Sequence, residues 1–227
     1  MSTGEKRTLQ INAVLGKAVD LLILNFICLL CCVPVITIFD SLAALHAVTL
    51  KLLRNETDSV VKPFFRFFRE NFVKSIPYTL IFLVTYAPGF AGVMTMAAGG
   101  MLWGLIVIPY TIILMILSGW VTVLFAQFDN SVGTTFGNAL KIAVVNPKIS
   151  LVLFAVNAYL PILFLVFPGV FGSVLYVWNL IGLAVQARIA CVVALPVLNA
   201  LMPEEVPVNE VIEVKEETEN ESGNEEL

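Results

Sequence analysis

Residues 101–125, MLWGLIVIPYTIILMILSGWVTVLF, form an apolar run without a single charged side chain. A helix rises about 1.5 Å per residue, so about 20 residues suffice to cross a hydrocarbon core of about 30 Å. Four other apolar stretches have comparable length: Ala18–Phe39, Ile76–Ala98, Ile149–Phe167 and Val170–Leu195. Within the five stretches only Asp20 and Arg188 carry charge. The sequence therefore predicts an all-α fold, a polytopic transmembrane helical bundle of about five spans.

The composition of the whole chain also indicates a membrane protein. Of the 227 residues 59% are hydrophobic and only 13% are charged, whereas a soluble domain contains about 25% charged residues. The mean hydropathy is +0.92. We expect three regions: a polar N-terminus at residues 1–17, a transmembrane helical domain at residues 18–202 and an acidic C-terminal tail at residues 203–227. The polar start and the long run behind it do not resemble a cleavable signal peptide, so the first apolar stretch should remain as a membrane helix.

The acidic tail differs in charge from the rest of the chain. Pro203–Leu227 contains ten Glu and one Lys, which gives it a charge of −9 and leaves +5 on the remainder of a chain of net charge −4. The tail has no aromatic residue and too little apolar surface to offset the entropy lost on ordering. We expect a disordered, solvated tail. The alternative is a docking role, for example as a clamp on a basic segment of the same chain.

Lysine and arginine are concentrated in two of the connections between the spans. Asp40–Ser75 contains six of these residues and Gln127–Lys148 contains two, whereas Gly99–Gly100 and Pro168–Gly169 contain none. Cytoplasmic connections carry an excess of Lys and Arg. The two basic connections and the C-terminus are therefore expected to be cytoplasmic, in a multi-pass protein of the cell membrane.

The N-terminus allows two interpretations of the first span. Five crossings place the N-terminus outside, although it contains Lys6, Arg7 and Lys17. Pro34 offers an alternative, because proline removes a backbone donor and commonly ends a helix. Val35–Leu53 would then return to the cytoplasm as the second arm of a hairpin, re-entrant if other helices bury it. The sequence leaves both interpretations open.

The segment Lys62–Lys74 combines aromatic and basic residues at helical spacing. In a helix, Phe64, Phe68 and Phe72 would share one face. The basic residues of the segment are Lys62, Arg66, Arg69 and Lys74, and Glu70 stands four residues from both Arg66 and Lys74. We expect an interfacial elbow helix with its rings in the acyl boundary and its cations toward anionic headgroups. A docking surface for a partner is the alternative.

A weaker version of this elbow precedes a later span. Phe136–Ser150 also mixes apolar and basic residues and ends with a Lys close to a Ser, directly before an apolar stretch. The similarity is short and gapped. The similarity is compatible with an internal duplication. In that case the chain contains two pairs of spans, and a basic elbow precedes each pair.

Residues suited to catalysis or metal binding are scarce. The chain contains one histidine, His46, and no HExxH, GxSxG, Walker-type or GxGxxG pattern. The four cysteines are expected to pack as small apolar side chains, because they lie in apolar spans without further ligands for zinc: Cys28, Cys31, Cys32 and Cys191. No catalytic, metal or cofactor-binding residue is predicted. We expect a protein that is not an enzyme and that has no nucleic-acid partner.

Polar side chains inside the spans are the candidate site residues, because polar and charged groups are costly in hydrocarbon. Arg188 is expected either to snorkel to the cytoplasmic interface or to pair with Asp20, Asp40 or Asp129. A structural role is favoured over a substrate or ion role. Four amides are expected to bridge helices by hydrogen bonds: Asn25, Asn157, Asn179 and Gln186.

The first part of the chain resembles a known family. The residues that carry the resemblance are Leu24 and Asn25, the run VPVITI at residues 33–38, Ala43–Leu45, Arg54 and Phe64–Lys74. They are similar to the YesL-like family, a group of bacterial integral membrane proteins classed as domain of unknown function 624. Where that family often has Gly-Pro, this chain has Phe39 and Asp40, which favours a helix that continues there.

The resemblance implies a function connected with transport. Family members resemble accessory proteins encoded near carbohydrate-uptake genes, and the resemblance supplies no catalytic residues. We expect an accessory or regulatory partner of a carbohydrate transport system, with the lipid bilayer and a transporter permease as partners. The alternative is a small transporter or channel acting by itself, suggested by the prolines in most spans and by Arg188.

Overall fold

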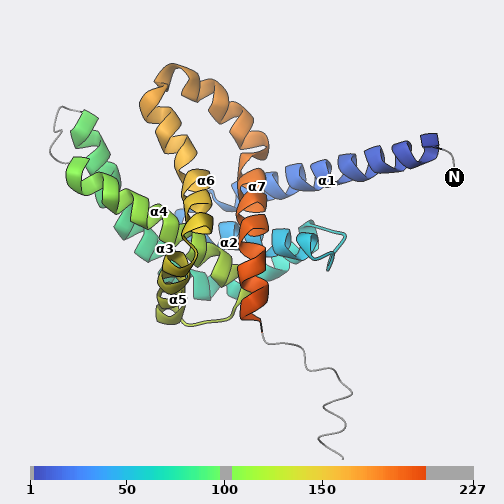
Figure 1. The fold of residues 1–227 in the computed structure, drawn as a ribbon, viewed down its shortest axis with the longest axis horizontal. Helices are drawn as coiled ribbons and strands as arrows, with labels where there is room; N and C mark the ends of the chain where they lie inside the picture. Colours follow the sequence, from blue (N-terminus) through green and yellow to red (C-terminus); the bar gives the residue numbers. More distant parts are fainter. Residues whose placement is uncertain (1–2, 98–103, 203–227) are drawn as a thin grey trace, which may run out of the picture. The chain divides into compact units, whose positions relative to one another are not determined.

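The computed structural model describes residues 3–97 and 104–202. These residues form seven α-helices, one short 3-10 helix and no strand, so the predicted all-α fold is confirmed for the described part of the chain (Figure 1). The helices are α1 (Thr3–Cys31), η1 (Val35–Thr37), α2 (Ile38–Leu53), α3 (Val61–Ala97), α4 (Gly104–Gln127), α5 (Val132–Val145), α6 (Pro147–Val166) and α7 (Pro168–Leu201).

The chain divides into two compact units, residues 1–196 and residues 197–227. All contacts and sites described below belong to the first unit. In the second unit the described residues continue α7 to Leu201. The predictions of a disordered acidic tail at residues 203–227 and of a short turn at Gly99–Gly100 lie outside the described residues.

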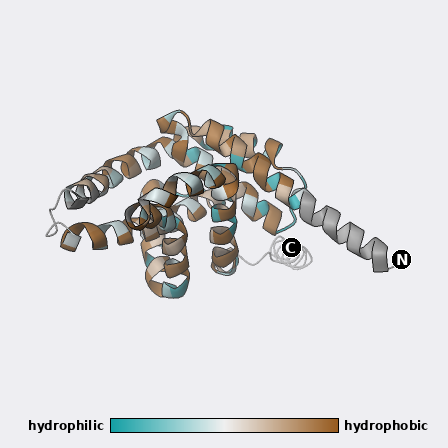
Figure 2. Ribbon diagram, turned by 90° about the horizontal axis from the view of Figure 1, so that it is seen from above, coloured by the Kyte–Doolittle hydropathy of each residue, from teal (hydrophilic) through white to brown (hydrophobic). Residues whose placement is uncertain are grey.

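Several helices have the length and composition needed to cross a membrane. Among the described residues there are four such stretches: Val35–Leu53, Gly104–Gln127, Pro147–Phe164 and Gly169–Leu201. Figure 2 shows hydrophobic residues along much of the helical surface. These helices support the interpretation of the chain as a membrane protein. The predicted span Ile76–Ala98 is helical within α3 as far as Ala97, but it is not one of the four, so the predicted number of five spans is not confirmed.

The helix is interrupted around Pro34, so the prediction of one continuous span over Ala18–Phe39 is wrong. Helix α1 ends at Cys31, and Pro34 has an extended backbone with φ −75° and ψ 123°. The Thr37 hydroxyl donates hydrogen bonds to the carbonyl oxygens of Cys31 (2.5 Å) and Pro34 (2.6 Å), and the first of these is a carbonyl at the end of a helix, where the intrahelical partner is missing. The residues after the break therefore form a separate arm, Val35–Leu53, as in the hairpin interpretation.

Helix α2 is the most buried of the four candidate spans. In the stretch that contains it, 67% of the residues are buried, against 33%, 17% and 28% in the other three. It packs against α1, α3 and α4 and runs without interruption through Phe39 and Asp40, as the departure from the family pattern suggested. On one side Phe39 stacks on Tyr78 of α3 and meets Phe125 of α4 edge-on, with ring centroids 4.9 and 5.1 Å apart. These contacts make α2 the core element of the first unit.

A second set of contacts joins α1, α2, the start of α3 and α7. Its buried residues form one apolar cluster: Leu24, Cys28, Ala44, Leu45, Val48, Val60, Phe64, Ala184 and Ala187. Three of the nine are alanines, and such small side chains let helices approach closely in a membrane. The aromatic segment after residue 62 thus contributes to the core of the bundle through Phe64.

The predicted elbow at Lys62–Lys74 is not a separate helix. The segment is helical, but it forms the first turns of α3, which runs unbroken from Val61 to Ala97. Phe64 is fully buried, whereas Phe68 and Phe72 are half-buried, and the three rings follow one another at 6.3 and 6.2 Å. The aromatic face therefore packs partly against the bundle. A separate interfacial orientation of this segment is not confirmed.

The two proposed halves of the duplicated plan differ at this point. Helix α5 ends at Val145, and Asn146 leaves the helical region with φ −117° and ψ 64°. Pro147 then begins α6, a position where a missing N–H costs nothing. A break thus separates α5 from α6, whereas the corresponding segment of α3 continues directly into its span.

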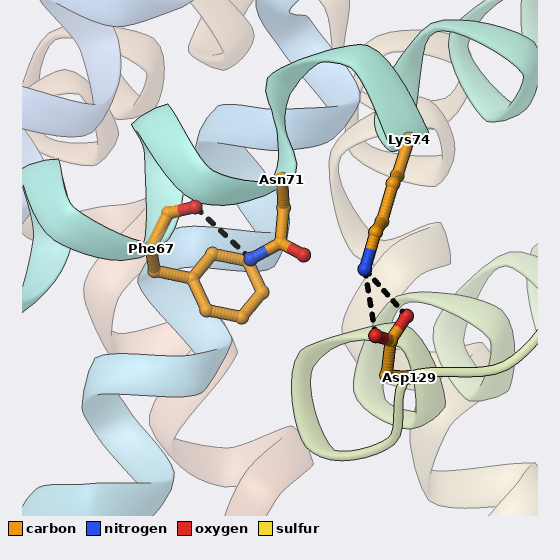
Figure 3. Close-up of polar contacts among 4 residues, drawn as sticks. All are labelled: Phe67, Asn71, Lys74 and Asp129. Carbon is orange, nitrogen blue, oxygen red and sulfur yellow. Dashed lines mark hydrogen bonds and ion pairs between the residues drawn. The ribbon is translucent and has the colours of Figure 1, made fainter.

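The charged residues of Lys62–Lys74 form one ion pair within α3 and one with a residue distant in sequence. Arg66 pairs with Glu70 at 3.0 Å, as its i, i+4 spacing predicts, and Arg69 is exposed. Lys74 instead reaches Asp129, in the connection between α4 and α5, with Nζ–oxygen distances of 2.6 and 2.8 Å (Figure 3). Side-chain exposures of 53% and 77% limit the Lys74–Asp129 pair to about 0–1 kcal/mol.

Candidate binding cavity in the helical bundle

A cavity of about 450 Å³ lies inside the first unit, with walls from η1, α2, α3, α4, α6 and α7. Small-molecule sites in proteins usually measure about 300–1,000 Å³. Most of the wall is apolar or aromatic, and the described residues that line it include no Asp, Glu, Lys or Arg. The polar and aromatic residues with hydrogen-bonding groups are His46, Thr79, Tyr86, Ser118, Thr122, Asn157, Tyr159, Trp178 and Gln186. This combination suits an uncharged ligand with some polar groups.

A chain of hydrogen bonds links four of the helices around this cavity. The Tyr86 hydroxyl of α3 donates to Ser118 Oγ of α4 at 2.9 Å, and Ser118 Oγ donates to the Met115 carbonyl at 3.0 Å. The same carbonyl accepts a bond of 3.2 Å from Asn157 Nδ2 of α6. Asn157 Oδ1 in turn accepts from Gln186 Nε2 of α7 at 2.9 Å. The network fixes α3, α4, α6 and α7 at one level of the bundle.

Gly119 allows α4 and α6 to approach at this level. A Cβ atom at position 119 would lie 3.0 Å from Asn157 Nδ2 and 3.2 Å from Leu153 Cβ, closer than ordinary van der Waals contact. One turn before Gly119, the Met115 carbonyl receives the Asn157 amide. The absence of a side chain at residue 119 therefore permits the contact on which the polar network depends.

Two groups on the cavity wall have hydrogen-bonding capacity to spare. His46 Nδ1 lies 2.7 Å from the Leu42 carbonyl oxygen, and because a carbonyl only accepts, Nδ1 carries the hydrogen. In a neutral ring Nε2 is then an acceptor. Trp178 Nε1 is buried and has no hydrogen-bond partner among the described residues. Since an unpaired buried donor is costly, a ligand acceptor that reached this N–H would be bound favourably.

Trp178 owes its position to a glycine on the same helix. The indole lies against α7 at Gly182, where a Cβ atom would overlap the ring. Trp178 and Gln186, two turns apart, both line the cavity. Gly182 thus allows a large aromatic group to form part of the cavity wall without moving α7.

Among the predicted site residues, Asn25 forms the most extensive contacts. Its side chain is fully buried, and Nδ2 donates to the Asn179 carbonyl of α7 at 2.7 Å. Its Oδ1 accepts from the Ala184 backbone N–H at 3.1 Å. One carboxamide of α1 thus joins two backbone groups of α7, which fits the bridging role expected for it. The Asn179 side chain bonds only within its own helix, to the Leu175 carbonyl.

The other predicted polar residues do not gather in one place. Asp40 is fully buried, and within residues 3–97 and 104–202 neither of its carboxylate oxygens has a hydrogen-bond partner. Arg188 and Asp20 line one small pocket away from the cavity, but no ion pair joins them. Asp129 pairs with Lys74 instead. Of the pairs expected for Arg188, none forms within the described residues.

The sequence interpretation missed part of the cavity wall. Gln186 and Asn157 were expected to bridge helices, and they do so with each other. Tyr86, Ser118 and Trp178 were not singled out, because a lone hydroxyl or indole in an apolar run carries no pattern. The described residues contain no group of three or more His, Cys, Asp or Glu side chains that could hold a metal ion, and the four cysteines are unpaired.

Comparison with known proteins relates the first part of the chain to one family. Residues 21–88 match the family described as "Protein of unknown function, DUF624". The match covers the end of α1, the break at Pro34, α2 and about three quarters of α3, and so includes the segments that carry the resemblance noted in the sequence. It covers less than a third of the chain. It supports the relation to this family, whose description assigns no function. No curated protein and no solved structure gave a significant match.

Proposed function

Proceeding from the similarity of residues 21–88 to DUF624, we propose that this chain is a YesL-like protein of a bacterial cytoplasmic membrane. It serves a carbohydrate transport system as an accessory or regulatory partner and catalyses no reaction. Its cavity binds the small uncharged solute that the system handles. The lipid bilayer and a transporter permease are its partners.

The observation that carries this proposal is the chemistry of the cavity wall. Tyr86 and Trp178 offer aromatic surface, Asn157 and Gln186 offer amides, and no charged side chain lines the described wall. A sugar presents both C–H faces, which pack on aromatic rings, and hydroxyls, which bond to amides. A charged solute would find no counter-charge there, and burying an unpaired charge is costly.

The geometry also favours a fixed binding site over a moving one. The hydrogen bonds from Tyr86 to Gln186 hold four helices around the cavity, and such a site can report occupancy to a partner.

One observation favours the alternative, a transporter acting by itself. Asn25 bonds to α7 at backbone groups, and helices bend where a side chain inserts among their hydrogen bonds.

Solute binding is tested with the full-length protein in detergent and a panel of neutral mono- and disaccharides. Gln186→Leu removes an amide from the cavity wall and should weaken binding of the best sugar about tenfold, because a hydrogen-bonding group is lost from a buried site. Tyr86→Phe should act in the same direction, and Tyr176→Phe is the matched control, since Tyr176 is 79% exposed. Isothermal titration calorimetry measures the three affinities. Equal sugar affinities in the three variants would show that the cavity is not the binding site.

The accessory role is tested separately from binding. We expect the tagged protein to co-purify with a sugar-transporter permease from membranes, and we expect liposomes that contain this protein alone to show no sugar flux. If those liposomes do show sugar flux, and the Arg188→Ala variant abolishes it, the accessory role is excluded and the protein is a transporter acting by itself.

The hairpin at Pro34 predicts the orientation of the helices. With α1 and Val35–Leu53 as two arms, all basic connections and both termini are cytoplasmic. In a chain whose native cysteines are replaced by alanine, an impermeant maleimide should label Gly169→Cys in intact cells. Thr3→Cys and Lys148→Cys should react only after permeabilisation. Labelling at position 3 in intact cells would restore the interpretation with an external N-terminus, and labelling at position 148 would reverse the whole orientation.

A further inference from the structure

We propose that a polar pocket between α1, the end of α2 and α7 binds the phosphate group of an anionic lipid. The pocket has a volume of about 280 Å³ and lies apart from the sugar cavity, with which it shares no lining residue. Its charged and polar residues come from three elements that are distant in sequence: Lys17 and Asp20 from α1, Asn55 after α2, and Arg188 from α7.

The charges of this pocket are not balanced within the described residues. Lys17 and Arg188 supply two positive charges and Asp20 supplies one negative charge, so the described lining carries +1. Among the residues that the structure describes, neither Arg188 nor Asp20 takes part in an ion pair, although Arg188 is half-buried and is the one charged residue of α7. A half-buried guanidinium binds phosphate oxygens through short, charge-assisted hydrogen bonds. A phosphodiester, with one negative charge, would make the pocket neutral.

The end of α2 places Asn55 at this pocket. Asn55 has a left-handed backbone, φ 58°, a conformation that asparagine tolerates better than most residues. The backbone N–H groups of Glu56 and Asn55 donate to the carbonyls of Lys51 (2.9 Å) and Leu52 (3.3 Å), the arrangement of a Schellman cap. The Asn55 amide adds a further donor to the pocket.

The neighbouring surface distinguishes a lipid from free phosphate. Directly beside the lining residues Leu21 and Arg188 in the chain, Leu22 of α1 and Ile189 of α7 are both 43% exposed. The polar connection that begins at Arg54 follows directly after α2, so the pocket lies where apolar helices meet a polar segment. Basic pockets between membrane helices bind the headgroups of anionic lipids. Here the acyl chains would follow the exposed apolar residues while the phosphate enters the pocket.

Native mass spectrometry of the full-length protein with added phosphatidylglycerol or phosphatidylcholine tests this inference. Phosphatidylglycerol should bind at least tenfold more tightly. Lys17→Gln and Arg188→Gln should each weaken its binding about fivefold, the loss expected for one cation near an anionic group. Asp20→Asn should tighten it by a similar factor, because it removes the competing carboxylate. Lys51→Gln is the matched control, since Lys51 is exposed on α2 and does not line the pocket.

Three outcomes would overturn the inference. They are equal binding of the two lipids, a loss with Lys51→Gln as large as with Arg188→Gln, and displacement of the lipid by inorganic phosphate at equal concentration, which would identify a free anion as the ligand. If Arg188→Gln does not fold, Asp20→Asn still decides the matter, because unchanged or weaker binding in that variant contradicts the assigned charges. None of these measurements involves sugar binding or a permease, so the result is independent of the proposed function.

Discussion

Gly119→Leu is expected to destabilise the bundle by about 1–3 kcal/mol, the usual cost of overpacking a well-packed contact. Even a Cβ atom at this position would lie 3.0 Å from Asn157 Nδ2, so a leucine must push α4 away from α6. The bond from Asn157 to the Met115 carbonyl would then be lost, and with it the level of the bundle that shapes the cavity. The variant should melt at a lower temperature in detergent and lose sugar binding.

The matched control for this variant is Gly137→Leu on α5. Nothing lies within 4 Å of a Cβ atom there, and leucine favours a helix more than glycine does, so Gly137→Leu should be neutral or slightly stabilising. Thermal unfolding followed by scanning fluorimetry compares the two. Equal melting temperatures for the two variants would show that α4 and α6 are not in close contact at Gly119.

Asn25→Leu is expected to cost about 2 kcal/mol, because it removes both hydrogen bonds by which this amide joins α1 to backbone groups of α7, at about 1 kcal/mol each. Single hydrogen bonds inside membrane proteins are often worth less than this, about 0.6 kcal/mol, but here one amide makes two. The local effect on α7 should be larger than the effect on the whole bundle. In hydrogen exchange, the Ala184 amide should exchange at least tenfold faster than in the unchanged protein.

Asn71→Leu serves as the control for this substitution. Its amide bonds only to the Phe67 carbonyl one turn earlier in its own helix (Figure 3), so its removal should leave exchange in α7 unchanged. If the Ala184 amide exchanged as slowly in Asn25→Leu as in the unchanged protein, the link between α1 and α7 would have no role in holding that part of α7.

The sequence was informative wherever a single residue or a composition decides the local structure. Long apolar runs indicated helices, Pro34 indicated a possible end of α1, and the spacing of Arg66 and Glu70 predicted their ion pair. The helix predicted for Lys62–Lys74 is present, but it is continuous with the rest of α3, because a change from polar to apolar composition does not by itself end a helix. Pro77 lies close to that change, and α3 nevertheless continues through it. At Asn146 the break is real because the residue before Pro147 adopts a non-helical backbone.

The cavity was less predictable because it depends on distances between helices. An amide in an apolar span, such as Gln186, signals a hydrogen bond without naming its partner. That Asn157 accepts from Gln186 and donates to Met115 follows from the approach of α6 to α4 at Gly119, which the sequence pattern does not contain. Asp40 shows the opposite failure, since it was expected as a possible partner of Arg188, and among the described residues its buried carboxylate has no hydrogen-bond partner.

The central place of α2 constrains the order in which the protein can be assembled during translation. The chain emerges from the ribosome N-terminus first, so α2, with its buried Asp40, is synthesised before α3 and α4 exist to cover it. A carboxylate that faced lipid during this interval would cost about 2.5–3.5 kcal/mol. Helix α1 precedes α2 and is joined to it by the turn that Thr37 closes, whereas α3, α4 and α7 all follow it. Until these are made, α1 is the one described neighbour available to shield α2 from its surroundings.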